Sequence, residues 1–398
     1  MILRKVGIVG GAMLLIFILG IGCSRKDHLQ VGADALKKGE FLKAVKELTK
    51  AQTQDTLNPD IYYNLCVAYA QLDSAKKALT NYAQLDRLNS PRKDDANLKL
   101  LVIKFLKLDP YAASPITIRG MANLFKGAPS PDGELVAVAA ARSFLSDIYL
   151  VKYDGKVIRK ITSGYMNNDP DFSPSGEHII YVSDRDGDEE LYLYDMKTQK
   201  TDQITDNKFV DFAPSFSPNG IEAVFVSNRD GNWEIYKINV HNQRAARLTN
   251  NKVWDGFPDY TPDGKYIVFS SKRGASEDIF SMKEDGSDEK LMYGTAAEEN
   301  DPHLNQDDLY FKTTRDGDWK IYRYDMKNKV LTRLTNNDNP NWNIRVSKDG
   351  SKLLYARNTR NRWQLNFINL LMPIPSGVIA EAANDTTKIV GNKPVGSK

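Results

Sequence analysis

The fold is decided by the stretch Val210-Asp211-Phe212-Ala213-Pro214-Ser215-Phe216-Ser217-Pro218-Asn219-Gly220 and by the residues after it up to Thr249. An apolar run, the turn Asn228-Arg229-Asp230-Gly231, a second apolar run and Arg247-Leu248-Thr249 complete this unit. The unit recurs roughly every 44 residues, which is a period typical of repeat folds. Its Ser-Pro-x-Gly turn begins at Ser130, Ser173, Ser217 and Thr261, is reduced at Asn305, and returns in altered form at Ser347.

Each unit contains four short segments of strand character. A stub ending in Phe or Tyr precedes the turn, and an apolar run, a Leu/Ile-Tyr run and a segment near Leu-Thr come after it. A four-stranded unit cannot bury both of its faces alone, so repetition at this period predicts a propeller whose blades bury one another. Six units predict six blades.

The unit also resembles a known family. Asp-x-x-Pro-x-Phe-Ser-Pro-x-Gly, then Ser-x-Arg-Asp-Gly-x-x-(Asp/Glu)-Ile-Tyr, then Leu-Thr-Asn is similar to the TolB-type propeller repeat of bacterial envelope proteins. The resemblance covers residues 115–371 and rests on three sub-motifs that recur in register. It implies an envelope protein that binds other proteins.

The N-terminus has the features of an export leader. Arg4 and Lys5 precede an uncharged run that ends in small residues, which predicts a signal peptide over residues 1–22. Leu19-Gly20-Ile21-Gly22-Cys23 resembles a bacterial lipobox, although its leucine stands four residues before the cysteine instead of three. This resemblance implies that Cys23 carries a lipid anchor in the cell envelope, with the outer membrane facing the periplasm as the expected place. An uncleaved transmembrane anchor is the alternative.

Composition fits an exported globular protein with two domains. Charged residues make up 26% and apolar residues 41% of the chain, which is ordinary for folded domains. The formal net charge of +3 is too small to indicate a nucleic-acid partner. With Cys23 lipidated, Cys66 has no second cysteine to pair with, and its apolar neighbours indicate a small buried side chain.

Residues 24–108 change to a helical period, with apolar positions that repeat at a step of about 34 residues. Asn58-Pro59 and Ser90-Pro91 have the form of helix starts, with a capping residue before the proline. The pattern resembles tetratricopeptide repeats: two repeats and a third partial unit over residues 94–106. Repeat arrays need about three units for stability, so this one is expected to lean on the propeller or on a partner.

The predicted organisation is multidomain: all-α tetratricopeptide-like repeats and then an all-β six-bladed propeller. Residues 109–115 are predicted to be a linker, residues 116–375 the propeller and residues 376–398 a disordered tail. The last unit lacks a clear fourth strand, because only Met372-Pro373-Ile374-Pro375 remains for it. Ring closure is therefore expected from residues 116–119.

Motifs of known catalytic families are absent from the sequence. The chain has no Gly-x-Ser-x-Gly, His-Glu-x-x-His or Cys-x-x-Cys, and its four histidines fall at unrelated repeat positions. The acidic run Asp184 to Glu190 raises the question of calcium, but an Asp-Gly hairpin turn explains the same residues without metal. No catalytic residue, metal or cofactor is expected, and the chain is not expected to be an enzyme.

One channel mouth collects the remaining candidate residues. A polar residue stands three positions before each inner-strand proline: Asn167, Asp211, Asp255 and Glu299. A recurrent arginine lies in the joint between the second and third strands: Arg185, Arg229, Arg273 and Arg315. Because strands alternate in direction, both sets reach the same face, together with Trp254 and Trp342. Local capping and strand-tying ion pairs, for instance with Glu234, explain these residues as well as a partner site does.

These patterns favour a membrane-anchored envelope scaffold that binds other envelope proteins through both modules. The alternative is a sensor in which the propeller channel binds a peptide or a glycan, or a propeller-type lyase or hydrolase.

Overall fold

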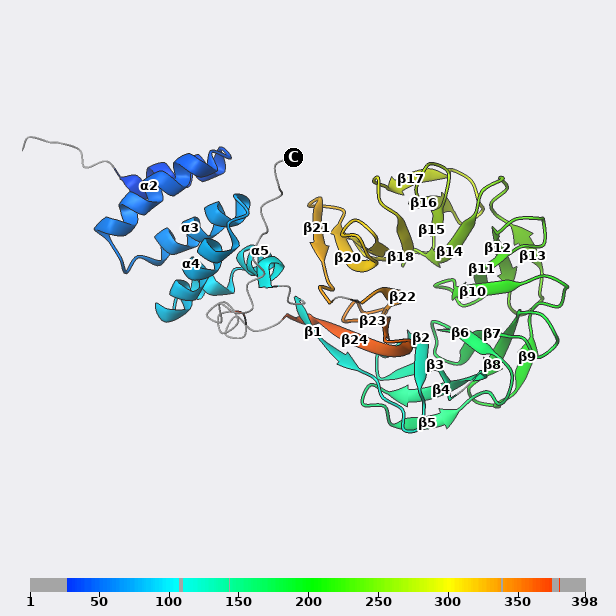
Figure 1. The fold of residues 1–398 in the computed structure, drawn as a ribbon. Helices are drawn as coiled ribbons and strands as arrows, with labels where there is room; N and C mark the ends of the chain where they lie inside the picture. Colours follow the sequence, from blue (N-terminus) through cyan, green and yellow to red (C-terminus); the bar gives the residue numbers. More distant parts are fainter. Residues whose placement is uncertain (1–26, 107–109, 143, 338, 374–378, 380–398) are drawn as a thin grey trace, which may run out of the picture.

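A computed structural model of the chain describes residues 27–106, 110–142, 144–337, 339–373 and 379. Six four-stranded antiparallel sheets are arranged as the blades of a propeller around a central axis, and a group of helices lies to one side of the ring (Figure 1). The predicted six-bladed propeller preceded by a helical region is therefore confirmed. The leader, including Cys23, lies outside the described residues.

Blades one to three come one after another along the chain. Blade one consists of β2 (Asn123–Pro129), β3 (Leu135–Ala141), β4 (Ser146–Lys152) and β5 (Val157–Lys160). Blade two consists of β6 (Asn167–Phe172), β7 (His178–Ser183), β8 (Glu190–Asp195) and β9 (Thr201–Gln203). Blade three consists of β10 (Asp211–Phe216), β11 (Glu222–Ser227), β12 (Glu234–Asn239) and β13 (Ala245–Arg247).

Blades four to six continue the ring. Blade four consists of β14 (Asp255–Tyr260), β15 (Tyr266–Ser271), β16 (Asp278–Lys283) and β17 (Lys290–Tyr293). Blade five consists of β18 (Glu299–Asn305), β19 (Asp308–Thr313), β20 (Lys320–Asp325) and β21 (Val330–Arg333). Blade six consists of β22 (Asn341–Val346), β23 (Lys352–Thr359), β24 (Arg362–Pro373) and, as its outer strand, β1 (Tyr111–Pro115).

The N-terminal edge of the propeller closes the ring, but not with the residues predicted. β1 pairs with β24, and Ala113 lies opposite Ile368. Residues 116–119 form no strand; instead Ile116 and Ile118 are buried between blades six and one. The prediction of closure by residues 116–119 is therefore wrong, and most of the expected linker belongs to the sheet.

The blades bury one another as the repeat predicts. The second strand of each blade is an apolar run that is buried on both faces, as in Ile179 to Val182 and Ala223 to Val226. Ile180 and Val182 of blade two pack in one cluster with Phe216 and Phe225 of blade three. The core is thus a series of blade interfaces around the axis.

The inner strands share one irregularity. The third residue of five inner strands has positive φ although none is glycine: Asp169, Ala213, Phe257, Asp301 and Asn343. The pairing register shifts at the same place in each strand. Positive φ is unfavourable for residues with a Cβ, so the surrounding blades must hold this bulge.

The turns have their predicted chemistry. In the Asp-Gly joints, Gly187, Gly231 and Gly317 have φ of 106°, 99° and 87°. The aspartate of each joint accepts a hydrogen bond from a tyrosine hydroxyl of the next strand, as Asp230 does from Tyr236. A hairpin interpretation is therefore confirmed for these joints.

The helical region contains α1 (His28–Lys37), α2 (Phe41–Gln54), α3 (Pro59–Gln71), α4 (Ala75–Arg87), a 3₁₀ turn (Pro91–Asp94) and α5 (Ala96–Leu106). The side chain of Asn58 caps α3 by accepting a hydrogen bond from the Asp60 amide. Cys66 is fully buried in α3, and burial raises the pKa of its thiol to about 12. No helix among the described residues is long and apolar enough to cross a bilayer.

Ile379 lies in the segment that was predicted to be a disordered tail, and it is fully buried. It packs into the helical core with Tyr82, Leu85, Leu98 and Val102. The prediction of disorder is wrong for this residue, and the rest of the tail lies outside the described residues. The chain therefore returns to the helices after the last propeller strand.

Candidate functional site

The predicted polar ring is present, but its side chains are buried. Asn167, Asp211, Asp255 and Glu299 are each 0% exposed. Each is the first residue of an inner strand. Their burial leaves no exposed acidic surface at the channel mouth and favours the local structural role over a partner site for these four residues.

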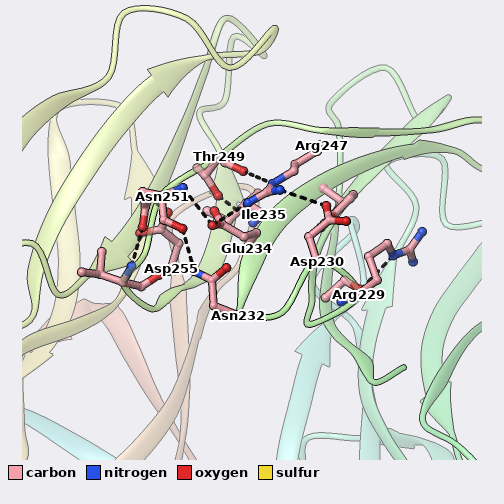
Figure 2. A network of polar contacts seen from close by, with 12 residues as sticks. Arg229, Asp230, Asn232, Glu234, Ile235, Arg247, Thr249, Asn251 and Asp255 are labelled. Atoms are coloured by element: carbon pink, nitrogen blue, oxygen red, sulfur yellow. Dashed lines mark hydrogen bonds and ion pairs between the residues drawn. The ribbon is translucent and has the colours of Figure 1, made fainter. Parts of the chain in front are cut away.

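Asp255 illustrates what these residues do. Its Oδ2 accepts a hydrogen bond of 2.6 Å from the side-chain Nδ2 of Asn251, and the backbone N–H of Asn251 donates to Glu234 Oε1 of blade three (Figure 2). Glu234 also accepts from Arg247 Nη2 at 2.8 Å. The network ties the start of blade four to the outer half of blade three. Burial raises the pKa of Asp255, and likewise that of Glu299.

The same connection joins blade two to blade three. The backbone N–H of Asn207 donates to Glu190 at 2.6 Å. The side-chain Nδ2 of Asn207 donates to Glu190 at 3.1 Å and to Asp211 at 2.8 Å. Burial raises the pKa of Glu190 to about 7. Sequence reasoning missed Asn207 and Asn251, although both stand two residues after the Leu/Ile-Thr pair that it had identified.

The recurrent arginines also make structural contacts within their own blades. Arg229 donates to Asp211 Oδ2 at 2.8 Å, and its guanidinium lies over the rings of Phe225 and Tyr236. The other three lie over aromatic rings of their own blades in the same way: Arg185, Arg273 and Arg315. The predicted ion pair between this arginine and Glu234 is wrong, because Glu234 pairs with Arg247.

All five tryptophans of the chain lie on the face where the inner strands begin. Besides Trp254 and Trp342 they are Trp233, Trp319 and Trp363, which stand at joints leading into third strands. We call the part of this face formed by Trp254, Trp319, Trp342 and Trp363 the tryptophan mouth. Trp342 contacts Trp319 and Trp363 at ring-centroid distances of 5.6 and 6.5 Å. All five are partly exposed.

A buried lysine lies beneath these rings. Lys312 is 1% exposed, and its Nζ lies 4.0, 5.0 and 5.2 Å from the ring centroids of Trp342, Trp319 and Phe257. Burial lowers its pKa to about 8. Lys312 stands where other blades have Val182, Val226 or Ser270, so the repeat alignment could have revealed it.

Exposed apolar side chains occupy the same face on blades one to three. Phe144 is 93% exposed, Leu145 53% and Tyr165 51%, and Met166 and Phe209 are also exposed. Phe144 stands where three other blades have the glycine of the Asp-Gly pair in the equivalent joint, and Leu145 follows it. We call Phe144, Leu145, Tyr165, Met166 and Phe209 the apolar patch. The fold does not require it.

The opposite opening of the channel, among the Ser-Pro-x-Gly turns, leads into a cavity of about 170 Å³. Its floor holds a polar network: Asp259 Oδ2 lies 2.8 Å from His303 Nδ1, and Arg345 Nη1 lies 2.9 Å from His303 Nε2. An arginine can only donate, so this geometry fits a neutral imidazole that donates from Nδ1. Burial opposes the charged form of His303, but the Asp259 carboxylate outweighs it and the pKa is raised. Burial also raises the pKa of the neighbouring Asp171 to about 6.

The described residues offer no metal site. No group of three or more His, Cys, Asp or Glu side chains among them is arranged to hold a metal ion.

Comparison with known proteins agrees with the fold. Residues 170–308 match the family described as the TolB beta propeller domain. TolB from Acinetobacter baumannii superposes with a TM-score of 0.51 and 21% identity over 71% of this chain and 70% of that chain. A TolB candidate from Agrobacterium tumefaciens gives 0.50 and 21% over 64% and 91%. This chain contains a TolB-like six-bladed propeller.

Matches to curated proteins are local. An uncharacterized protein of Agrobacterium fabrum is 32% identical over 84 residues, which are 21% of this chain and 29% of that protein. A TolB homolog of Chlorobium luteolum is 40% identical over 67 residues, which are 16% of this chain and 15% of that protein. The chain thus matches less than a third of the length of either relative.

Proposed function

We propose that this chain is a scaffold protein of the bacterial cell envelope that binds other envelope proteins and carries out no catalytic step. The TolB-like propeller supports an envelope role. The lipobox-like sequence supports a lipid anchor at Cys23 and the outer membrane facing the periplasm.

The observation that carries this proposal is the apolar patch. Its side chains are exposed, they lie on one face, and Phe144 stands where other blades have the glycine of an Asp-Gly turn. Exposed apolar groups gathered on one face mark protein interaction sites. The polar ring and the arginines are excluded as the main contact because blade packing already uses them.

The helices offer a second surface. A cavity of about 430 Å³ lies between α2, α3 and α4 and is bordered by Thr49, Gln52, Tyr69, Lys77, Asn81 and Gln84. The start of α2 at Phe41 and of α4 at Ala75 keeps the repeat step found in the sequence. This supports tetratricopeptide-like repeats whose groove binds an extended segment of a partner.

The patch is tested by Phe144→Ala. Aromatic anchors at the centre of an interface often contribute about 2 kcal/mol or more, so capture of the partner from solubilised membranes should fall at least roughly tenfold. The melting temperature should not change, because Phe144 makes little contact with the fold. Quantitative mass spectrometry of the captured proteins measures the effect.

Ile221→Ala is the matched control, since Ile221 is 46% exposed on the opposite face and its loss should leave capture intact. Equal capture by Phe144→Ala and the unmodified protein, with loss of capture by Tyr69→Ala, would move the partner site to the helices.

A further inference from the structure

The base of the tryptophan mouth contains a buried donor, Lys312, that has no acceptor among the residues the structure describes. Nζ of Lys312 has aromatic rings on three sides, and within the described part of the chain no carboxylate lies within ion-pair distance of it. Asp301 and Glu277 act on it only through longer-range electrostatics. A buried ammonium without an oxygen partner is costly, so this geometry favours a ligand oxygen at Nζ.

A buried acceptor without a donor lies beside it. Asn300 is opposite Lys312 in the β18–β19 pair, so the two side chains are neighbours on the same face of the sheet. Asn300 is 5% exposed; its Nδ2 donates to Glu277, while its Oδ1 has no partner among the described residues. Among the described residues, Lys312 Nζ and Asn300 Oδ1 thus have no hydrogen-bond partner, and these two buried groups belong to opposed residues of β18 and β19.

Aromatic surfaces surround these two groups. Trp319 and Trp342 lie over Lys312, and Trp363 extends the surface from Trp342 toward blade one. On the blade-four side, Trp254 lies across Gly256, where any side chain would collide with its ring. The rings are partly exposed, so their free surface is available to a ligand.

These features together select one ligand chemistry. A hydroxyl group both donates and accepts, so neighbouring hydroxyls of one molecule can satisfy Asn300 Oδ1 and Lys312 Nζ at once. The apolar C–H face of a sugar ring matches the face of a tryptophan. A cationic ligand would be repelled by Lys312, and a purely apolar side chain would leave both polar groups unsatisfied.

We propose that the tryptophan mouth is a glycan-binding site, in which Trp319, Trp342 and Trp363 stack on sugar rings while Lys312 and Asn300 hydrogen-bond to their hydroxyl groups. This site is separate from the apolar patch and gives the chain a second ligand class. The hydroxyl groups of the sugar are the groups recognised, and an envelope polysaccharide as its source rests on the proposed function.

The position of the tryptophans supplies the assay. All five lie on this face, so ligand binding at the mouth should change the intrinsic fluorescence of the full-length protein. The probes are the tetramer of N-acetylglucosamine and maltotetraose, which distinguish an N-acetylated polysaccharide from a neutral glucan. At least one of them should give a saturable change with a dissociation constant of about 10 mM or tighter.

Lys312→Met and Trp342→Ala are the decisive variants. Each should weaken binding at least roughly tenfold, because loss of the ammonium removes a charged hydrogen bond and loss of Trp342 removes a stacking surface. Lys312→Met should fold normally, since an apolar chain of similar length replaces a buried charge. Trp233→Ala is the control: Trp233 is on the same face but packs on Phe212 at 5.2 Å, so binding should persist.

Two results would overturn the proposal. One is the absence of saturable binding of both sugars to the unmodified protein, and the other is unchanged affinity in Lys312→Met. Loss of protein capture in Lys312→Met and Trp342→Ala without any sugar binding would instead assign the mouth to a protein partner. The apolar-patch test is independent, because Phe144 contacts none of these residues in the described interactions.

Discussion

At the scale of single residues, the polar groups that the repeat places at each inner-strand start serve to join blades. Glu190 accepts two hydrogen bonds from Asn207, which also donates to Asp211 of the next blade. Glu190 is only 2% exposed, and this burial makes its charged form unfavourable. The joint is therefore sensitive to pH in a direction that can be worked out.

Glu190→Gln should flatten the dependence of stability on pH. The pKa of Glu190 is raised from 4.5 to about 7 on folding, so its stabilising contribution is complete below pH 4.5 and disappears as pH rises through 7. The unmodified protein should lose roughly 2 kcal/mol of stability between pH 5 and pH 8 from this group, since one pKa unit corresponds to about 1.4 kcal/mol. Glutamine has no charge to bury, and the variant should lose less.

Thermal melts from pH 5 to pH 8 measure this difference. Glu177→Gln removes the same charge from an exposed position and should reproduce the unmodified profile. Parallel profiles for Glu190→Gln and the unmodified protein would show that Glu190 titrates normally in the fold.

The sequence predicted which residues share a face of the propeller, but it did not predict how far their side chains are buried. Strand alternation correctly brings Asp211, Arg229 and Trp254 to one end of the channel. Asp211 is buried with its partner Asn207, which lies in the connection from the preceding blade. The position of Asn207 recurs in the repeat as Asn251, but the sequence does not show which side chains it contacts. Lys312 differs, because a lysine within an apolar run was visible in the alignment of the repeats.

At the scale of elements, ring closure depends on β1. It supplies the fourth strand of blade six, and Tyr111 and Ala113 pack on the core of that blade. The direction of closure could be predicted, because blade six lacks its outer strand. The exact residues could not be predicted, because Tyr111–Pro115 has no counterpart in the other units. A strand of five residues is also too short for its apolar pattern to fix the register.

Replacing residues 111–115 by Gly-Ser-Gly-Ser-Gly should lower the melting temperature of the propeller by roughly 5 °C or more. Glycine and serine disfavour the strand and remove the contacts of Tyr111 and Ala113, which leaves the edge of β24 exposed. A loss of about 2 kcal/mol corresponds to such a shift in a domain of this size. Differential scanning calorimetry of the full chain measures it.

The matched variant replaces the same residues by Thr-Val-Thr-Val-Thr, which restores strand propensity at equal length. It should recover most of the stability. If the glycine-serine variant melts like the unmodified protein, β1 is dispensable and blade six is stable with three strands.

At the scale of the whole molecule, the helices and the propeller are connected at both ends of the propeller and not by a single linker. Helix α5 leads into β1, and Ile379, beyond β24, is buried in the helical core. The helical module has, among the described residues, two helix pairs and one further helix, fewer than repeat arrays usually need. A segment from beyond the propeller thus contributes to a core that would otherwise be short of apolar contacts.

The proposed scaffold role also requires that the molecule be held at a membrane, and Cys23 is the residue proposed to do this. The chain has two cysteines, so they provide a matched pair of variants. Cys23→Ala should move the protein from the membrane fraction to the soluble fraction or leave an unprocessed precursor, because each buried lipid CH₂ contributes about 0.8 kcal/mol to membrane binding and the acyl chains would be lost.

Cys66→Ala removes only a thiol inside α3 and should remain with the membrane. Fractionation with mass spectrometry of the N-terminus distinguishes the outcomes. Full membrane retention of Cys23→Ala with its leader intact would replace the lipid anchor by a transmembrane segment at residues 6–22.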